Sequence, residues 1–276
     1  MESNFFLTAE NWLFYITLVL YAVSMVLYIL FIAVKKENIC NTAIKITYAG
    51  FLLHTLAIVS RGIGAGRAPF SNQYEFSSSF AWGIVLCFII FERRFKFKTL
   101  GIFIMPIAIL IIGYAAMLSK DVHQLMPALQ STWLVIHVSV AIISYGSFAV
   151  ACGTSLVEIF RPKMKSEFAA QYIPDEEKLD TISYRVIALG FVSLTLCIIT
   201  GAIWGKRALG HYWQWDPKET WSLITWIVYS IYLHQRSRRK MKGKKAAIYA
   251  VVGFVCVIFT YFGVNLLLPG LHSYVL

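Results

Sequence analysis

Residues 12–34 read WLFYITLVLYAVSMVLYILFIAV, a stretch without a charged side chain. An α-helix rises about 1.5 Å per residue, so these 23 residues can cross a hydrocarbon core of about 30 Å. Seven more apolar runs follow, at residues 43–61, 77–92, 98–118, 132–157, 181–204, 219–235 and 246–268. The third and seventh runs are short for a bilayer, so their helices are expected to extend into flanking polar residues. The sequence therefore predicts an all-α fold, a polytopic membrane bundle of about eight transmembrane helices in a single membrane domain over residues 1–276.

The composition also indicates a membrane protein. Hydrophobic residues make up 58% of the chain and charged residues 14%, whereas a soluble domain is about half apolar and about a quarter charged. A net charge of +11 would suggest nucleic acid in a soluble protein. Here the basic residues lie in the loops between apolar runs, and no nucleic-acid-binding module is recognisable. The lipid bilayer is the expected partner, and nucleic acid is not.

The basic residues also predict an orientation. Loops on one side of the bundle hold 18 lysines and arginines, and loops on the other side hold six. Short loops rich in these residues stay in the cytoplasm, so both termini and the loops 62–76, 119–131 and 205–218 are expected outside. The basic run 236–240 could instead bind acidic lipid or a partner. The preference of lysine and arginine for cytoplasmic loops explains this run by itself, so we interpret it as a segment that fixes the orientation of the chain in the membrane.

The five cysteines, at positions 40, 87, 152, 197 and 256, form no Cys-x-x-Cys pair, and four lie inside apolar runs. They are expected to be packing residues, without a disulfide framework or a thiol redox motif. The first apolar run lacks a basic leader, so no cleavable signal peptide is expected.

Residues 204–226 hold five of the eight tryptophans of the chain, and the segment begins WGKRALGHYWQWDPKETW. An interfacial belt of aromatic residues is the plain alternative. A belt does not require so many rings in one external loop, nor the charged residues that interrupt them. We interpret residues 205–218 as a flat aromatic shelf with charged edges. Such a shelf suits a large planar apolar ligand that carries carboxylates, such as haem.

The charged residues of this loop suggest two roles. Lys206, Arg207 and Lys218 can pair with haem propionates. Asp216 and Glu219 cannot, so we expect these two acids to brace the loop or to cap the next helix. The proline after Asp216 suits a first helical turn, and acidic side chains are favoured there.

Histidines supply the candidate iron ligands. His137 lies at the external start of one helix and His272 follows the last helix, on the same side as the aromatic loop. Two neutral imidazoles can hold one haem iron as axial ligands. His54 lies about 13 Å deep, too deep to share an iron with His234 near the cytoplasmic surface. It is expected to pack helices or to lie on a haem path, while the histidines at 123 and 211 are expected to be solvated loop residues.

The segment WQWDPKETW, residues 213–221, closely resembles the tryptophan-rich WWD motif of a System II cytochrome c biogenesis family, the haem-handling proteins called CcsA or ResC. The resemblance also covers residues 69–75, 133–137, 222–226, 232–234 and 271–274, and so spans most of the chain. Leu209 departs from the family pattern, because relatives often carry another tryptophan there. This departure concerns one ring of the shelf.

The resemblance implies haem handling and delivery across the membrane for covalent attachment to apocytochrome c. It implies that His137 and His272 ligate haem iron externally and that His234 serves a second haem site in the membrane. The implied haem-binding residues are His137, His272, His234, Trp204, Trp213, Trp215, Asp216 and Trp221. No catalytic residue is assigned, because the chain is expected to present haem b within a holocytochrome c synthase complex while the substrate supplies the thiols.

The resemblance also implies partners. A separate CcsB/ResB-type membrane protein is expected to supply the second ligand at the His234 site. Apocytochrome c and thiol-reducing biogenesis proteins complete the set. The expected location is a bacterial cytoplasmic membrane or a plastid thylakoid membrane, with the external haem site facing the periplasm or the lumen.

Three alternatives remain open. A haem exporter or sensor without attachment activity shares most of these features. A secondary transporter of another solute predicts a charged midplane site, which the sequence does not indicate. A b-type electron carrier requires histidine pairs that face each other within the helices, whereas the histidines here lie mostly at helix ends.

Overall fold

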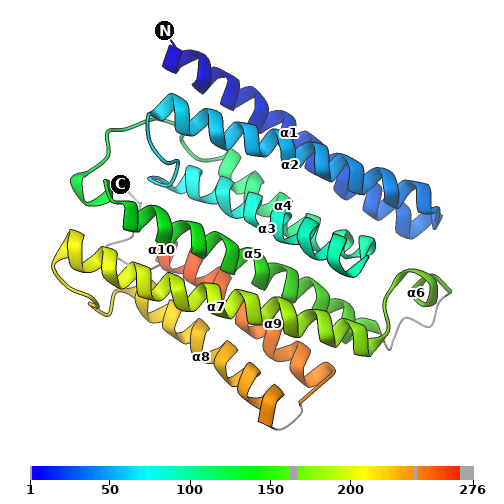
Figure 1. Ribbon diagram of the computed structural model, residues 1–276. Helices are drawn as coiled ribbons and strands as arrows, with labels where there is room; N and C mark the ends of the chain where they lie inside the picture. Colours follow the sequence, from blue (N-terminus) through cyan, green and yellow to red (C-terminus); the bar gives the residue numbers. More distant parts are fainter. Residues whose placement is uncertain (1, 162–166, 239–240, 268–276) are drawn as a thin grey trace. The chain divides into compact units, whose positions relative to one another are not determined.

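The computed structural model describes residues 2–161, 167–238 and 241–267, and every regular element within them is a helix (Figure 1). The long helices are α1 (Glu2–Val34), α2 (Glu37–Ala65), α3 (Gln73–Phe95), α4 (Gly101–Ala116), α5 (Thr132–Phe160), α7 (Glu176–Leu209), α8 (Pro217–Arg238) and α9 (Lys244–Ile258). The short elements are η1 (Lys98–Leu100), η2 (Pro127–Leu129), α6 (Glu167–Tyr172), the π-helical turn η4 (Phe259–Gly263) and α10 (Val264–Leu267). The all-α prediction is confirmed.

Seven described segments have the length and apolar composition of membrane-spanning helices. They are Ser3–Val34, Glu37–Ala65, Gln73–Phe95, Lys98–Ala116, Thr132–Phe160, Glu176–Leu209 and Lys244–Leu267. The chain is therefore an integral, multi-pass membrane protein. The two short apolar runs do extend into polar flanks, as α3 and α8. Helix α8 is not among the seven segments because serine, threonine and tyrosine interrupt its apolar residues, so its crossing of the bilayer stays a prediction.

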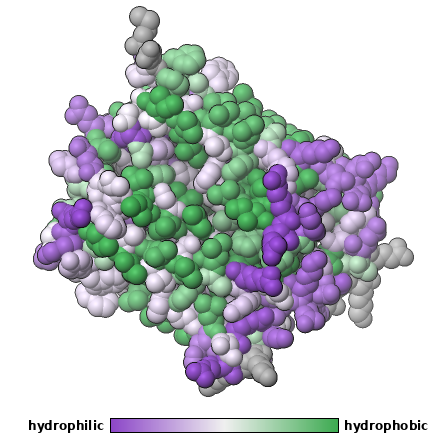
Figure 2. Space-filling model, in the orientation of Figure 1, coloured by the Kyte–Doolittle hydropathy of each residue, from purple (hydrophilic) through white to green (hydrophobic). Residues whose placement is uncertain are grey.

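The surface agrees with this class. Figure 2 shows apolar side chains over much of the face in view and hydrophilic side chains mainly along its edges. Large apolar side chains are exposed along α1 and α2, for example Val19, Val26, Leu52 and Val59. A large exposed apolar surface is unusual in a soluble monomer but is expected against lipid.

The helices form two compact units. Unit 1 comprises Met1–Gln124 and Gln171–Ile173, and unit 2 comprises Leu125–Ala170 and Pro174–Leu276. The single membrane domain expected from the sequence stays a prediction.

In unit 1, α1 packs along α2, and α4 packs against α1 and α3. Polar side chains inside the unit are paired. Ser24 Oγ lies 2.7 Å from Thr47 Oγ1. Buried hydroxyl groups that bond to one another avoid the cost of leaving a polar group unsatisfied in an apolar environment.

In unit 2, α5 packs against α7 and α9, and α8 packs against the same two helices. Helices α5 and α7 run antiparallel, because Ser144 Oγ donates to the Gly190 carbonyl (2.9 Å) and Ser155 Oγ donates to Ser183 Oγ (3.4 Å). This register places the first turns of α5 beside the last turns of α7. His137 lies in those first turns of α5, and Trp204 lies in those last turns of α7.

Candidate functional site

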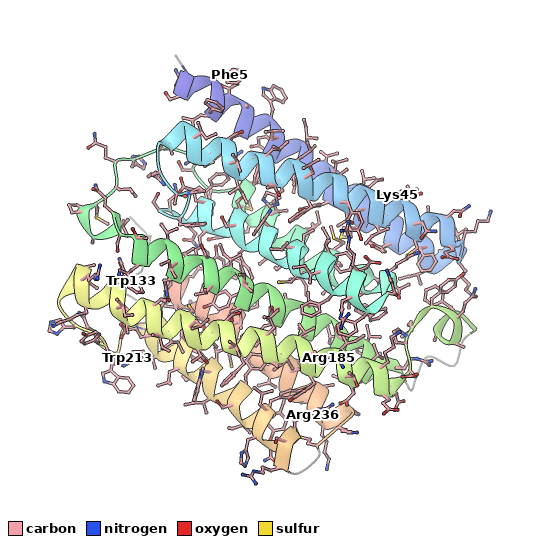
Figure 3. All side chains as sticks on the ribbon, viewed as in Figure 1. Phe5, Lys45, Trp133, Arg185, Trp213 and Arg236 are labelled. Carbon is pink, nitrogen blue, oxygen red and sulfur yellow. The ribbon has the colours of Figure 1, made fainter. Side chains whose placement is uncertain are left out.

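Most of the predicted site residues that the structure describes lie where α5 begins, α7 ends and α8 begins, whereas His234 lies near the far end of α8. We call this part of unit 2 the loop end, and it comprises the first turns of α5, the last turns of α7, residues 210–216 and the first turn of α8. Figure 3 shows Trp133 and Trp213 at this end, while Arg236 lies toward the other end of the same unit.

His137 is held by the backbone of α7. Its Nδ1 lies 2.8 Å from the carbonyl oxygen of Cys197 and 3.5 Å from Cys197 Sγ. A carbonyl oxygen can only accept, so Nδ1 carries the hydrogen, and in the neutral imidazole the lone pair is then on Nε2. Histidines that bind metals commonly donate their second ring N–H to a backbone carbonyl in this way. His137 is therefore held in a tautomer that suits iron coordination.

Gly201 gives the His137 ring its place against α7. A Cβ atom at position 201 would lie 2.8 Å from His137 Cε1 and 2.8 Å from its Nδ1, closer than packed atoms approach. Cys197 and Gly201 are four residues apart, so they share one face of α7. One turn of this helix supplies both the hydrogen-bond acceptor and the space for the imidazole.

Trp204 is mainly a packing residue in this structure. Its side chain is buried, with the whole residue 8% exposed, and its Nε1 donates to the Ala128 carbonyl at 2.9 Å. This bond holds η2 against the end of α7. Contact between Trp204 and haem stays a prediction.

Asp216 and Glu219 form a capping box at the start of α8. Asp216 Oδ1 accepts from the Lys218 N–H at 2.9 Å. Glu219 Oε2 accepts from the Asp216 N–H at 3.2 Å and from the Gln214 N–H at 2.8 Å. Pro217 occupies the first helical position, which needs no N–H donor. The prediction that the two acids brace the loop and cap the helix is confirmed, while haem contact by Asp216 stays a prediction.

Trp215 adopts a left-handed backbone conformation, with φ of +58°. This conformation costs a residue with a side chain about 1–2 kcal/mol. The residue is nevertheless 69% exposed, so ring burial does not compensate for the cost. Backbone strain of this kind concentrates at functional sites.

The rings of Trp213 and Trp215 do not form a flat shelf. Their centroids are 5.7 Å apart and their planes meet at 89°, an edge-to-face arrangement. This geometry is favourable for two indoles because the positive edge of one ring meets the negative face of the other. The flat surface expected from the sequence is therefore wrong for this pair. A planar ligand would lie on one ring and meet the edge of the other.

Trp221 packs against the π-helical turn of unit 2. Its ring centroid lies 4.1 Å from that of Phe259 in η4. Single π-helical turns inside α-helices are frequent at functional sites. His272, the second predicted external ligand, lies outside the described residues.

Cationic side chains surround the loop. Lys206 Nζ donates to the Gly210 carbonyl at 2.9 Å and lies 5.6 Å from the Tyr212 ring centroid. The Arg207 guanidinium lies 5.4 Å from the Trp133 ring centroid. Both cationic side chains are exposed, which leaves them accessible to an anionic ligand.

Lys218 is the third predicted cation and precedes the predicted membrane span 219–235. Burial lowers the pKa of its amine to about 8, and the nearby Asp216 carboxylate acts in the opposite direction. The charge of Lys218 is therefore sensitive to pH near neutrality, unlike that of an ordinary lysine.

The remaining described histidines differ in burial. His54 is completely buried, with Nδ1 3.3 Å from Tyr21 Oη and Nε2 3.0 Å from Ser78 Oγ. These contacts agree with a packing role for His54, and a place on a haem path stays a prediction. His123 and His211 are exposed, as expected for solvated loop residues.

His234 is exposed near the end of α8, opposite the loop end of unit 2. Arg236, two residues later, donates to both carboxylate oxygens of Asp180 and to the Met241 carbonyl at 3.2 Å. The Gly243 N–H donates to Asp180 Oδ1 at 3.3 Å. The first arginine of the basic run therefore clamps the end of α8 to α7, in addition to any role in orientation.

Unit 1 carries the other segment singled out in the sequence, residues 69–75. The carboxylate of Glu75 accepts from Arg61 Nε (2.9 Å), from Arg67 Nη1 (2.8 Å) and Nη2 (3.1 Å), and from the Ser71 N–H (2.8 Å). Asn72 Oδ1 accepts from the Glu75 N–H at 2.8 Å and so caps α3. Glu75 is 2% exposed, which makes this a buried ionic network.

The same end of unit 1 holds the linker after α4. Lys120 Nζ lies 4.3 Å from the Phe14 ring centroid and 4.0 Å from that of Tyr15. Burial lowers the pKa of the Lys120 amine, and Glu10 acts in the opposite direction. Tyr74 donates a short hydrogen bond to Glu10. These contacts anchor the linker to α1.

Sequence reasoning did not find several residues that shape the loop end. Cys197 acts through its backbone oxygen, and Gly201 acts by having no side chain. Ala128 likewise contributes a carbonyl. The position of Phe259 depends on the π-helical turn, which no residue pattern in the sequence predicts. The one available signal was the four-residue spacing of Cys197 and Gly201 on a helix that ends at the aromatic loop.

These features define a class: multi-pass helical membrane proteins with a tryptophan-rich loop braced at a helix start and a histidine held beside it. The chain belongs to the Cytochrome C assembly protein family, whose family model matches residues 70–272. Three proteins called cytochrome c biogenesis protein CcsA are similar to it. The one from Chlamydomonas reinhardtii is 40% identical over 250 residues, which covers 88% of this chain and 70% of the relative. The one from Nymphaea alba is 37% identical over 302 residues (98% and 97%), and the one from Prochlorococcus marinus strain MIT 9301 is 37% identical over 269 residues (88% and 87%).

A solved structure has the same fold. The cytochrome c haem lyase CcmF aligns with a TM-score of 0.75 at 13% identity, over 93% of this chain and 46% of that one. The chain therefore spans less than half the length of that protein, and the similarity shows the fold alone. The resemblance to CcsA-type proteins is confirmed by the relatives above.

Proposed function

We propose that this chain handles haem in the maturation of c-type cytochromes. In this proposal it is a CcsA-type subunit that carries haem through the membrane and presents it for covalent attachment to apocytochrome c. Membership in the Cytochrome C assembly protein family supports the cytochrome c part of the proposal. The fold shared with a cytochrome c haem lyase agrees with the haem part.

The observation that carries the external site is the hydrogen bond from His137 Nδ1 to the Cys197 carbonyl. It fixes the ring orientation and leaves the lone pair on Nε2, the atom that an imidazole offers to iron. We assign His137 as one axial ligand and His272 as the second.

The aromatic residues of the loop end would then surround the haem ring. Trp215 offers an exposed face, and Trp213 stands perpendicular beside it. Trp221 and Trp204 complete the predicted set, and Asp216 holds the loop through its cap. Exposed Arg207 and pH-sensitive Lys218 are placed in the same segment to pair with propionates. The chain contributes binding and orientation, while haem iron between two histidines has its redox potential set by those ligands.

We assign His234 to a second haem site at the other end of unit 2. Its side chain is exposed near the end of α8, and Arg236 fixes that helix end through Asp180. An exposed histidine at the membrane level suits a ligand shared with another membrane protein. We propose a CcsB/ResB-type subunit as that partner, and thiol-reducing proteins that keep the apocytochrome cysteines reduced.

The membrane would be a bacterial cytoplasmic membrane or a thylakoid membrane. The loop end would face the periplasm or the lumen, because the basic loops mark the opposite side. The haem delivered would be haem b, which becomes haem c when its vinyl groups react with the substrate thiols.

The test is the haem spectrum of the purified full chain with its partner subunit. Wild type is expected to show a low-spin signal of two histidine ligands. His137→Ala and His272→Ala are each expected to weaken that signal, with recovery on added imidazole. His123→Ala, which removes an exposed loop histidine, is the matched control and should leave the spectrum unchanged.

Three outcomes would count against the proposal or part of it. Haem that is insensitive to both substitutions would exclude the external site. A wild-type protein that binds no haem would exclude haem handling and favour a transporter of another solute. Haem binding without thioether formation on an added apocytochrome would leave the exporter or sensor as the better description.

A further inference from the structure

The Trp215 ring is presented by a backbone that tryptophan rarely adopts. Its φ of +58° lies in the left-handed region, where residues other than glycine, asparagine and aspartate are uncommon. The residue is 69% exposed, so ring packing does not account for the conformation. The explanation has to lie in the backbone contacts on either side of Trp215.

One carboxylate oxygen makes those contacts. Glu219 Oε2 accepts from the N–H of Gln214, before Trp215, and from the N–H of Asp216, after it. Backbone N–H groups that converge beside a left-handed residue form a concavity that attracts an anion. In this loop the anion is a side chain of the same chain. Thr220 Oγ1 also donates to the Trp215 carbonyl at 3.4 Å, which adds a third contact.

We infer that Glu219 is a positioning residue: its carboxylate holds the N–H groups on both sides of Trp215, which keeps that residue left-handed and its indole directed outward for haem. The functional part rests on the proposed haem role, whereas the structural part does not. A capping box by itself uses the N–H of the cap residue. Because of the second bond, from the Gln214 N–H, Glu219 holds the backbone on both sides of Trp215.

The matched pair of variants is Glu219→Ala and Glu219→Gln. Alanine removes the acceptor, whereas glutamine keeps an acceptor oxygen at the same reach and removes only the charge. If Glu219 acts through its two hydrogen bonds, glutamine at position 219 should still hold the backbone of Trp215 in its left-handed conformation. If Glu219 acts through its charge, the two variants behave alike. Glu177→Ala removes an exposed glutamate from the first turn of α7 and controls for general effects at a helix start.

The first readout needs no haem. Acrylamide quenching of indole fluorescence is measured in full-length protein with and without Trp215→Phe, so that the difference reports residue 215. Glu219→Ala is expected to change that difference by on the order of twofold, because the freed backbone leaves the strained region. Glu219→Gln and Glu177→Ala should match wild type. An unchanged difference in Glu219→Ala would overturn the inference.

The second readout is a double-mutant cycle on haem affinity. Trp215→Ala and Glu219→Ala are each expected to weaken binding by on the order of tenfold, the scale of one aromatic contact. The double variant should bind no more weakly than Trp215→Ala, because Glu219 then has no ring to position. Additive losses would overturn the functional part. If wild type binds no haem, the proposed function fails, and the quenching experiment still decides the role of Glu219.

Discussion

Two helix starts in this molecule use the same local device. In unit 1, Asn72 caps α3 and Glu75 follows three residues later. In unit 2, Asp216 caps α8 and Glu219 follows three residues later. Each glutamate reaches back to a backbone N–H before its helix, that of Ser71 or that of Gln214. Both segments have the sequence pattern of a capping box, with a side-chain cap and a glutamate three residues later.

The surroundings of the two glutamates differ. Glu75 is 2% exposed and is held by two arginines, Arg61 and Arg67. Glu219 is partly exposed and holds the backbone around a strained tryptophan. The same pattern therefore locks a loop by buried charge in unit 1 and presents an aromatic ring in unit 2. A capping pattern alone does not say which use a loop makes of it.

The largest expected effect is a difference in stability between variants of the two glutamates, Glu75 at the start of α3 and Glu219 at the start of α8. Glu75→Ala should lower the free energy of unfolding by about 3–5 kcal/mol, because it leaves the buried Arg61 and the partly buried Arg67 without their carboxylate. Glu219→Ala should cost about 1 kcal/mol, the value of a helix cap. Thermal unfolding of the detergent-purified chain measures both. Equal losses of stability in the two variants would contradict the view that Glu75 stabilises the fold whereas Glu219 mainly positions Trp215.

A second prediction tests whether haem binding depends on the position of the His137 ring against Gly201. Gly201→Ala places a Cβ within 2.8 Å of the His137 ring and should displace it, with a loss of haem affinity of about tenfold to a hundredfold. Titration of purified protein with haem, followed by its absorbance, gives the affinity. Gly113→Ala in α4 is the matched control, because no atom lies within 4 Å of a Cβ there. A normal affinity in Gly201→Ala would show that the orientation of His137 is not critical.

Parts of both turns could be predicted from the sequence. Long apolar runs define the helices because a bilayer requires about 20 such residues. The acid after Trp215 and the glutamate three residues later predict a capped helix start. The sequence also placed His137 and the aromatic loop on one side.

The rest depends on atoms that residue identity does not specify. The partner of His137 is a backbone oxygen, that of Cys197, and the place of its ring depends on an absent side chain at Gly201. The perpendicular packing of Trp213 and Trp215 is set by backbone torsions, and the expected flat shelf assumed torsions that composition cannot supply. Residues that act through side-chain chemistry were therefore found, and residues that act through shape were not.

A third prediction compares the lysines of the two units. Lys218 carries its charge below a pKa of about 8 and loses it above. Haem, as an anionic ligand, should bind about threefold more weakly as pH rises through 8, the scale of a partly exposed ion pair. Lys218→Met should remove this pH dependence. Lys120→Met is the control, because the Lys120 ammonium is enclosed by the rings of Phe14 and Tyr15 in unit 1. A pH profile that survives in Lys218→Met would assign the titration to another group.

The smallest expected effect concerns a second buried glutamate. Glu158 on α5 is 3% exposed, and neither of its carboxylate oxygens has a hydrogen-bond partner. Burial of a charge without a partner is costly, whereas a neutral amide of the same shape avoids that cost. Glu158→Gln should therefore leave the free energy of unfolding unchanged or raise it by up to about 1 kcal/mol.

The control is Glu75→Gln, the same substitution at the buried glutamate that has charged partners. It should destabilise the chain because Arg61 and Arg67 lose the opposite charge. Thermal midpoints of the two variants at one pH make the comparison, and the outcome depends on pairing because burial is nearly equal at the two positions. A loss in Glu158→Gln as large as in Glu75→Gln would mean that Glu158 is ionised and has a cationic partner. The buried charge that stabilises unit 1 would then have a counterpart in unit 2. The aromatic loop of unit 2 would be the remaining difference between the units that this comparison concerns.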